Sequence, residues 1–398
     1  MDAPALRRIL LELIGTARRP SLAGLSTADW AMLDRMAVQH RLQPLLHAQH
    51  RDNRAIPGAI AAGWRAAHRA AAITALAQAA DLRVTVTLLE DAGFAPIALK
   101  GAWLAHHAYP EAAQRPARDI DLLLDSDTVM PAFDLLLSKG YSLESAPEMA
   151  LADVLRLDKH MPPLLTPGGT RIELHQYLWE REGRLSHAIP AARDADFRQR
   201  ATRGADGLLY PASADMLAHL IIHAIYSHRL DCGPLLLPDL DFLLRKAAAG
   251  QPDFWADFWR EFWARAAREG WQSGARLVLE LVAHYREGAL IDFAAATVPA
   301  PADLLSAAPD LLLQELDTRR SAGFAAAALN GGPGQLFARL RGTHRAQGER
   351  AATRDMTAEG GFSGWASSRL IRTLGELSRR DVRRQSRELA RLSKWLDQ

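Results

Sequence analysis

Hydrophobic residues recur every three or four positions through the first part of the chain, which is the spacing of an amphipathic helix. Leu6 and Ile9 begin one such series. An alanine-rich segment follows at residues 59–91, and Gly93 stands just beyond it, where a glycine often ends a helix. The pattern predicts that residues 1–92 form an N-terminal helical region.

Short apolar runs bounded by turn residues replace this helical spacing after Gly93. Residues 94–99 and 120–124 have the length and composition of strands. Residues 162–166 and 171–175 flank a Pro-Gly-Gly sequence, which is typical of a hairpin. The helices expected between these strands are residues 102–109 and 128–139. We therefore predict a small mixed sheet in an α/β core at residues 93–180.

Helical periodicity returns near Pro211 and dominates the rest of the chain. An aromatic stripe at helical spacing is typical of a core or an interface, and it consists of Phe254, Trp255, Phe258, Trp259, Phe262 and Trp263. Glycine and proline cluster at residues 322–335, which predicts a loop. We expect residues 181–398 to form a C-terminal helical region. The predicted fold class is α+β, with a small mixed-sheet core between two helical regions.

Composition narrows the class of protein. The 398 residues are 48% hydrophobic, enough for a sizeable core, and the formal net charge of +2 argues against a dedicated electrostatic nucleic-acid binder. The single cysteine, Cys232, excludes a disulfide within the chain and suits a reducing compartment. No segment approaches the roughly 18 uninterrupted apolar residues of a membrane span. We expect a cytoplasmic protein that does not bind a membrane.

Two aspartates, Asp119 and Asp121, stand two positions apart at the start of a predicted strand. Alternate residues of a strand share a face, so both carboxylates are expected to point the same way, with Cα atoms about 6.6 Å apart. Burying two like charges is costly unless a cation compensates them. Paired divalent metal ions at such a site stabilise the entering and leaving oxygens of a phosphoryl displacement. The pattern favours a metal site over a coincidence of spacing.

A third carboxylate is expected from a neighbouring strand. Glu173 lies between Ile172 and Leu174 on the second strand of the predicted hairpin, which makes it the best candidate. His175 is two residues further on and therefore shares its face. We predict that Asp119, Asp121 and Glu173 are the catalytic residues and the metal ligands.

Lys100 and Gly101 directly follow the first predicted strand and precede a short helix. A glycine at such a turn lets the backbone approach a phosphate, and a helix that follows offers free N–H groups to the anion. The lysine adds a positive charge for phosphate oxygens. We predict that both residues bind a nucleotide.

These segments resemble a family of uncharacterised bacterial nucleotidyltransferases in the polymerase-β-like superfamily. The resemblance covers about residues 94–245 and rests on Ala98-Leu99-Lys100-Gly101, Tyr109-Pro110, Arg115-Pro116, Asp119-Ile120-Asp121-Leu122-Leu123, His160 with Pro162-Pro163-Leu164, Ile172-Glu173-Leu174-His175, Leu220-Ile221-Ile222-His223-Ala224 and Leu236-Leu237-Pro238-Asp239-Leu240. It implies a mixed-sheet nucleotidyltransferase core, two Mg²⁺ ions and transfer of a nucleoside monophosphate from an NTP. Asp119 and Asp121 would hold the metals, and Glu173 would help to activate an acceptor hydroxyl.

The resemblance also has a departure. Lys100 and Gly101 stand where the superfamily usually has Gly-Ser, and Ala102 follows the glycine here, so no serine is present to contact the triphosphate. Arg115, and with it Arg118 in the same loop, is a candidate for phosphate binding, with a solvated loop arginine as the alternative. The residues predicted to line the cleft are His160, His175, His223 and Asp239.

Two other patterns favour structural interpretations. His219 and His223 share a helix face with His228 nearby, but no HExxH motif accompanies them, so a polar-core role is preferred to zinc binding. The C-terminal segment 363–398 is basic and amphipathic, typical of a solvated helix. Binding of RNA there is an alternative that is not favoured.

The sequence therefore predicts a metal-dependent nucleotidyltransferase that uses an NTP and releases pyrophosphate. The acceptor is left open among a small molecule, a peptide and a protein, and an oligomer is compatible with the aromatic stripe. The alternative is a non-catalytic module on the same fold that senses a nucleotide or binds another protein.

Overall fold

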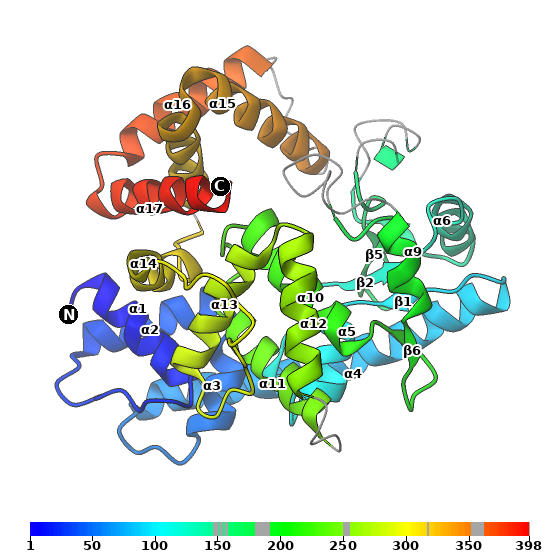
Figure 1. Cartoon of the computed structure of the whole chain (residues 1–398), viewed down its shortest axis with the longest axis horizontal. Coiled ribbons are helices and arrows are strands. Elements are labelled where there is room, and N and C mark those ends of the chain that lie inside the picture. Colours follow the sequence, from blue (N-terminus) through cyan, green and yellow to red (C-terminus); the bar gives the residue numbers. More distant parts are fainter. Residues whose placement is uncertain are drawn as a thin grey trace.

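The computed structural model describes residues 1–145, 151, 154–155, 158–179, 192–249, 255–316, 318–351 and 362–397. One mixed sheet lies at one end of the molecule, and helices occupy the remainder (Figure 1). The α+β class is therefore confirmed. Phe254 and the predicted boundary at residues 180–181 lie outside the described residues.

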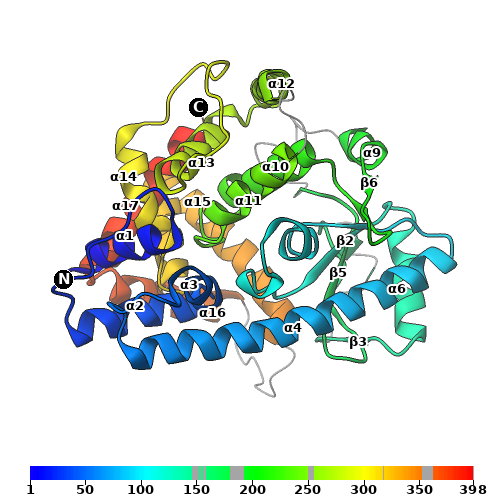
Figure 2. The same ribbon diagram turned by 90° about the horizontal axis from the view of Figure 1, so that it is seen from below.

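Four helices form the N-terminal part, as predicted. They are α1 (Ala3–Ile14), α2 (Thr27–Gln39), α3 (Gln43–His50) and α4 (Gly58–Asp91). Helix α2 begins with a capping box, in which Ser26 and Asp29 each bond the backbone N–H of the other. Helix α4 runs from the N-terminal helices to the sheet (Figure 2).

Helix α4 is also the one helix in the described part of the chain that is long and apolar enough to cross a membrane by length and composition. It packs against α3 and against α6 (Val129–Ser138), which is a helix next to the sheet. Core helices of soluble folds pass the same length and composition test.

In the described part of the chain the sheet has seven strands, in the order β3-β4-β5-β2-β1-β7-β6. The strands are β1 (Ile97–Ala98), β2 (Ile120–Leu123), β3 (Ser142–Leu143), β4 (Leu164–Leu165), β5 (Arg171–His175), β6 (Thr202–Arg203) and β7 (Leu209–Tyr210). All four predicted strands are present, and β4 and β5 form the predicted antiparallel hairpin. The strands β3, β6 and β7 were not predicted, because each has two residues and none lies within a longer run of the kind that indicated β1 and β4.

The β6–β7 hairpin corrects the picture of a purely helical C-terminal region. Its strand β7 pairs with β1 in the same sheet, so the region that begins at residue 181 contributes strands as well as helices. The described helices of this region are α9 (Ala192–Gln199), α10 (Ser213–Ile222), the π-helix η3 (His223–Ser227), α11 (Leu236–Ala248), α12 (Trp255–Arg268), α13 (Gln272–Tyr285), α14 (Ala302–Leu312), α15 (Arg319–Ala351), α16 (Phe362–Glu376) and α17 (Arg380–Leu396). Helix α9 precedes the hairpin.

Residues 322–335 form no loop, contrary to prediction. They lie within α15, which breaks its helical geometry at Gly331 and Gly332 and continues beyond Pro333. The glycine pair therefore makes a kink in a helix rather than a connection between helices.

The predicted helix at residues 102–109 has an unusual form. It consists of one α-helical turn, α5 (Gly101–Trp103), followed by the π-helix η1 (Leu104–Ala108). A short 3-10 helix, η2 (Ala112–Gln114), then leads into the loop before β2. π-helical turns occur often at functional sites.

Four members of the aromatic stripe on α12 are buried, namely Phe258, Trp259, Phe262 and Trp263. Trp259 and Trp263 belong to the large core that joins the N-terminal helices to α10–α14 and α17. Their indole N–H groups donate to the backbone carbonyls of Leu290 and Asp292, at 3.2 and 2.7 Å. The prediction of a core role is confirmed for these two tryptophans.

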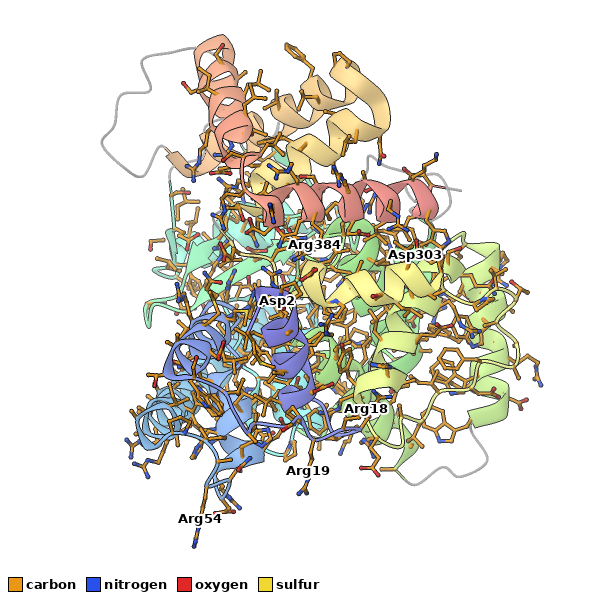
Figure 3. All side chains as sticks on the ribbon, turned by 90° about the vertical axis from the view of Figure 1, so that its left-hand side faces the viewer. Asp2, Arg18, Arg19, Arg54, Asp303 and Arg384 are labelled. Carbon is orange, nitrogen blue, oxygen red and sulfur yellow. The ribbon has the colours of Figure 1, made fainter. Side chains whose placement is uncertain are left out.

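The arginines of α17 dock this helix onto α14. Arg384 pairs with Asp310 at 3.0 Å, and Arg391 pairs with Asp303. Figure 3 shows Arg384 and Asp303 between these two helices. Part of the basic face is therefore neutralised by carboxylates of the same chain.

Candidate active site on the sheet

The acidic residues come together because β2 and β5 are parallel neighbours in the sheet. Asp121 and Glu173 are direct partners in their register. Ile120, Leu122 and Leu174 belong to the core beneath α4 and α6, so alternation along the strands places Asp121 and Glu173 on the opposite face.

Three side chains converge on this face. The Nε2 atom of His175 donates to Asp121 Oδ1 at 2.8 Å and lies 3.6 Å from Glu173 Oε2. Lys100 Nζ lies 3.2 Å from the other oxygen of Asp121, Oδ2. Asp121 is 5% exposed and His175 is 2% exposed, so these charges meet almost out of contact with water.

The charges are mutually stabilised. Burial alone would raise the pKa of Asp121, but Lys100 and His175 outweigh it and hold that pKa well below its usual value. Burial likewise opposes the ionised form of Glu173, yet the hydrogen bond from His175 and the charge of His160 lower its pKa to about 2. The pKa values of Lys100 and His175 are raised, because the carboxylates overcome the effect of burial. Both carboxylates are therefore ionised and compensated by cations.

Asp119 takes a different position from the one predicted. Strand β2 begins at Ile120, so Asp119 stands at the end of the preceding loop. Among the described residues, the group close enough to share a metal ion consists of Asp121, Glu173 and His175, whose ligand atoms lie within 4.8 Å of one another. Burial, Asp121 and Glu173 raise the pKa of Asp119 to about 6, which shows that its charge acts on the same site.

Lys100 is held in an unusual backbone conformation. Its φ of 41° and ψ of −111° lie outside the regions that non-glycine residues favour. Such strain persists only where the surrounding structure enforces it, and it is frequent at functional sites. Here the turn from β1 into α5 directs the lysine toward Asp121.

Gly101 is required by a close approach of Arg115. A Cβ atom at position 101 would lie 2.5 Å from Arg115 Nη1. Arg115 is fixed in place because its Nε and Nη2 atoms donate to both oxygens of Asp239, at 2.8 and 2.9 Å. Tyr109 donates a third hydrogen bond to Asp239 at 2.6 Å.

This buried group changes the interpretation of two predicted residues. Arg115 is not a solvated loop arginine, and two of its nitrogens are occupied by Asp239. Asp239, which was expected in the cleft, instead ties the loop before β2 to α11. Arg118 is exposed in the same loop.

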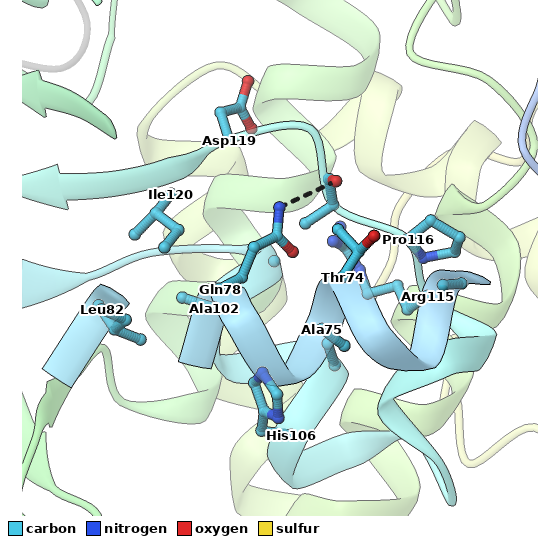
Figure 4. A pocket seen from close by; sticks show the side chains of 14 residues that line it. Thr74, Ala75, Gln78, Leu82, Ala102, His106, Arg115, Pro116, Asp119 and Ile120 are labelled. Carbon is cyan, nitrogen blue, oxygen red and sulfur yellow. Dashed lines mark hydrogen bonds between the residues drawn. The ribbon is translucent and has the colours of Figure 1, made fainter. Parts of the chain in front are cut away.

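A pocket of about 80 Å³ opens beside the loop, between α4 and α5 (Figure 4). Gly101, Arg115 and Asp119 line it together with Gln78, which donates to the carbonyl of Ala117 at 3.3 Å. Leu82 and Ile120 also line it, so it lies mainly on the α4 side of the sheet. It therefore adjoins the carboxylate site through Asp119 and is not the space above Asp121.

The histidines surround the carboxylates from two sides. His160 is bridged to His175 in the sheet, and its Nε2 lies 4.0 Å from Glu173 Oε2. His219 and His223 of the helix pair α10–η3 are neutral, since burial and the charge of Lys100 hold both pKa values well below the ordinary one.

His219 is the residue that sequence reasoning placed in a polar core without linking it to this site. Both of its ring nitrogens are buried and have no hydrogen-bond partner among the described residues, and its ring packs against Trp179 with the ring centroids 4.9 Å apart. The charge of Lys100 lowers the pKa of His219 and the charge of Asp121 raises it, although His219 lies on α10, far from both residues in the sequence. Only the i and i+4 spacing with His223 signalled this residue. In the part of the chain that the structure describes, His219, His223 and His228 form no metal-binding group.

A family model described as "Uncharacterised nucleotidyltransferase" matches residues 26–287, which is most of the chain. No curated protein and no solved structure matches the chain significantly. The matched region contains Lys100, Asp119, Asp121 and Glu173, together with all seven strands.

Proposed function

Because the chain belongs to this family of uncharacterised nucleotidyltransferases, we propose that it moves a nucleoside monophosphate from an NTP to an acceptor hydroxyl. The observation that carries the proposal is the pairing of Asp121 with Glu173 on adjacent parallel strands, with Lys100 beside them. Lys100 and His175 already compensate these two carboxylates, whose oxygens are also the ligand atoms that Mg²⁺ takes beside a nucleotide. This donor set fits a divalent metal ion.

The proposed ligands of two Mg²⁺ ions are Asp119, Asp121 and Glu173. When bound, the ions would neutralise charge on the triphosphate and stabilise the entering and leaving oxygens. Lys100 would bind phosphate oxygens, in place of the serine that the superfamily usually has. Arg118, exposed on the loop next to Asp119, would add a second positive charge.

The chemistry follows from these positions. Glu173 accepts the proton of the acceptor hydroxyl, with His175 holding the carboxylates in place. The hydroxyl oxygen attacks the α-phosphorus of the NTP, and the bond from that phosphorus to the bridging oxygen breaks. Pyrophosphate leaves with the electron pair. The chemistry requires only a hydroxyl on the acceptor, which a small molecule, a peptide or a protein can each supply.

The experiment that tests the proposal is nucleotide binding by the full chain with Mg²⁺ and a panel of NTPs. We expect binding that is abolished in the double variant Asp119→Ala with Asp121→Ala, because the metal–triphosphate complex loses its ligands. The control is Asp125→Ala with Asp127→Ala, which removes two exposed carboxylates just past the same strand. Unchanged affinity in the first double variant would falsify the metal-site assignment.

A second candidate is a non-catalytic nucleotide-binding module on the same fold. Two observations favour it, namely Ala102 in place of the usual serine and the ion pair that already occupies Lys100. The two functions differ in turnover. Release of pyrophosphate with any acceptor supports the transferase, whereas binding of NTP without release across a broad acceptor panel supports the module.

A further inference from the structure

His175 places a nitrogen atom beside the carboxylates of Asp121 and Glu173, and this nitrogen affects which metal ion the three residues can bind. His175 Nε2 is a single atom that contacts Asp121 Oδ1 at 2.8 Å and approaches Glu173 Oε2 at 3.6 Å. This nitrogen itself lies beside both oxygens, so a metal ion shared by the two carboxylates would replace the proton that His175 donates there. A ligand set at this point therefore contains an imidazole nitrogen as well as oxygens.

Lys100 leaves this arrangement open. It pairs with Asp121 Oδ2, whereas His175 meets Oδ1 of the same carboxylate. Asp121 Oδ2 can therefore remain paired with Lys100 while Oδ1 binds a metal ion. The register of β2 and β5 fixes the Asp121–Glu173 pair on rigid elements rather than on loops.

Ligand chemistry distinguishes the divalent ions. Mg²⁺ prefers an octahedron of oxygens and is usually held by one or two carboxylates and substrate phosphates. Imidazole suits first-row transition metals such as Zn²⁺, Fe²⁺ and Ni²⁺, whereas sites made only of carboxylate, carbonyl and water ligands suit Mg²⁺, Ca²⁺ and Mn²⁺. A buried histidine at the metal position therefore favours a transition-metal ion.

We propose that Asp121, Glu173 and His175 form a mixed nitrogen–oxygen site that binds a first-row transition-metal ion in preference to Mg²⁺. The inference rests on the proposed function for the role of the metal, and it replaces the expected all-oxygen ligand set. It makes His175 a ligand rather than a group that only orients Asp121.

His160 provides a matched control. It lies beside His175 and near the same carboxylate, but its Nε2 is 4.0 Å from Glu173 Oε2 and its Nδ1 bonds the carbonyl of Met161 at 2.9 Å. His160 is also outside the group whose ligand atoms converge. Replacing it changes the charge near Glu173 without removing a ligand of the proposed site.

The test is electron spin-echo spectroscopy of Mn²⁺ bound to the full-length protein without nucleotide, together with calorimetric titration of Mn²⁺ and Mg²⁺. The wild type and His160→Gln should show coupling of Mn²⁺ to a ¹⁴N nucleus and should bind Mn²⁺ more tightly than Mg²⁺. His175→Gln should lose that coupling and should bind Mn²⁺ about tenfold or more weakly. Circular dichroism establishes that each variant is folded.

Three results would overturn the inference: no Mn²⁺ binding, bound Mn²⁺ without nitrogen coupling in the wild type, or nitrogen coupling that persists in folded His175→Gln. The wild-type spectrum decides the matter even if His175→Gln fails to fold. Because no nucleotide is present, the outcome is separate from that of the proposed function. A nitrogen-coupled Mn²⁺ site in a protein that binds no NTP would keep this inference and reject the transferase.

Discussion

Asp119 is a proposed metal ligand, but its negative charge destabilises the folded protein when no metal is bound. Its pKa rises from 3.8 to about 6 because it is buried beside Asp121 and Glu173. Between these two values the folded chain holds a proton that the unfolded chain has lost. The free energy of unfolding contributed by this group therefore falls as pH rises through that window.

We predict that Asp119→Asn stabilises the metal-free protein at pH 8 by roughly 1–2 kcal/mol, because the amide removes a repelled charge. The gain should shrink toward pH 4, where the wild-type carboxyl is protonated. Urea unfolding in the presence of a chelator measures it, with exposed Asp127→Asn as a control that should change little. A loss of stability at pH 8 would mean that the attraction between Asp119 and Lys100 exceeds the repulsion of Asp119 by Asp121 and Glu173.

The turn after β1 depends on an element far along the chain. Arg115 occupies the space beside Gly101 because Asp239 of α11 holds both edges of its guanidinium. The pair of hydrogen bonds from Arg115 to Asp239 thus connects the C-terminal helices to the turn that carries Lys100. Through this contact the packing of α11 sets the geometry of the proposed phosphate-binding turn.

We predict that Gly101→Ala destabilises the protein by about 1–3 kcal/mol, because the added methyl group must displace the fixed guanidinium. The matched control is Gly63→Ala in α4, where a Cβ would meet nothing within 4 Å. That change should stabilise the helix by up to about 1 kcal/mol, the difference in helix propensity between the two residues. Chemical unfolding of both variants gives the comparison, and equal effects would contradict the proposed clash.

At the scale of the whole molecule, the core extends beyond the region that matches the family. The match covers residues 26–287, yet the large core also contains Leu10 of α1, Leu311 of α14 and Leu392 of α17. Arg7 of α1 and Arg384 of α17 both pair with Asp310 of α14. The terminal helices are thus built into the same core as the central ones.

We predict that removing residues 302–398 lowers the melting temperature by at least about 10 °C or makes the protein insoluble, because it exposes the leucines that α14 and α17 cover. Removing only residues 380–398, which form α17, should have a smaller effect. Calorimetry of the three chains checks the order. An unchanged melting temperature in the shorter chains would show that the central region folds independently.

The sequence by itself determined the elements and the residue types of the site. Periodicity identified α4, and alternation in two short apolar segments identified β2 and β5 with Asp121 and Glu173 on them. These patterns are local, because each reflects how one helix or strand meets water on one side and the core on the other.

Only the tertiary structure decided which of these segments are neighbours. It placed Asp121 opposite Glu173, moved Asp119 off the strand, and joined Arg115 to Asp239 across 124 positions of sequence. It also brought His219, from a distant helix, within the influence of Lys100. Strand register and contacts between helices arise when separate apolar surfaces pack together, and the spacing of residues within one segment does not encode its partner.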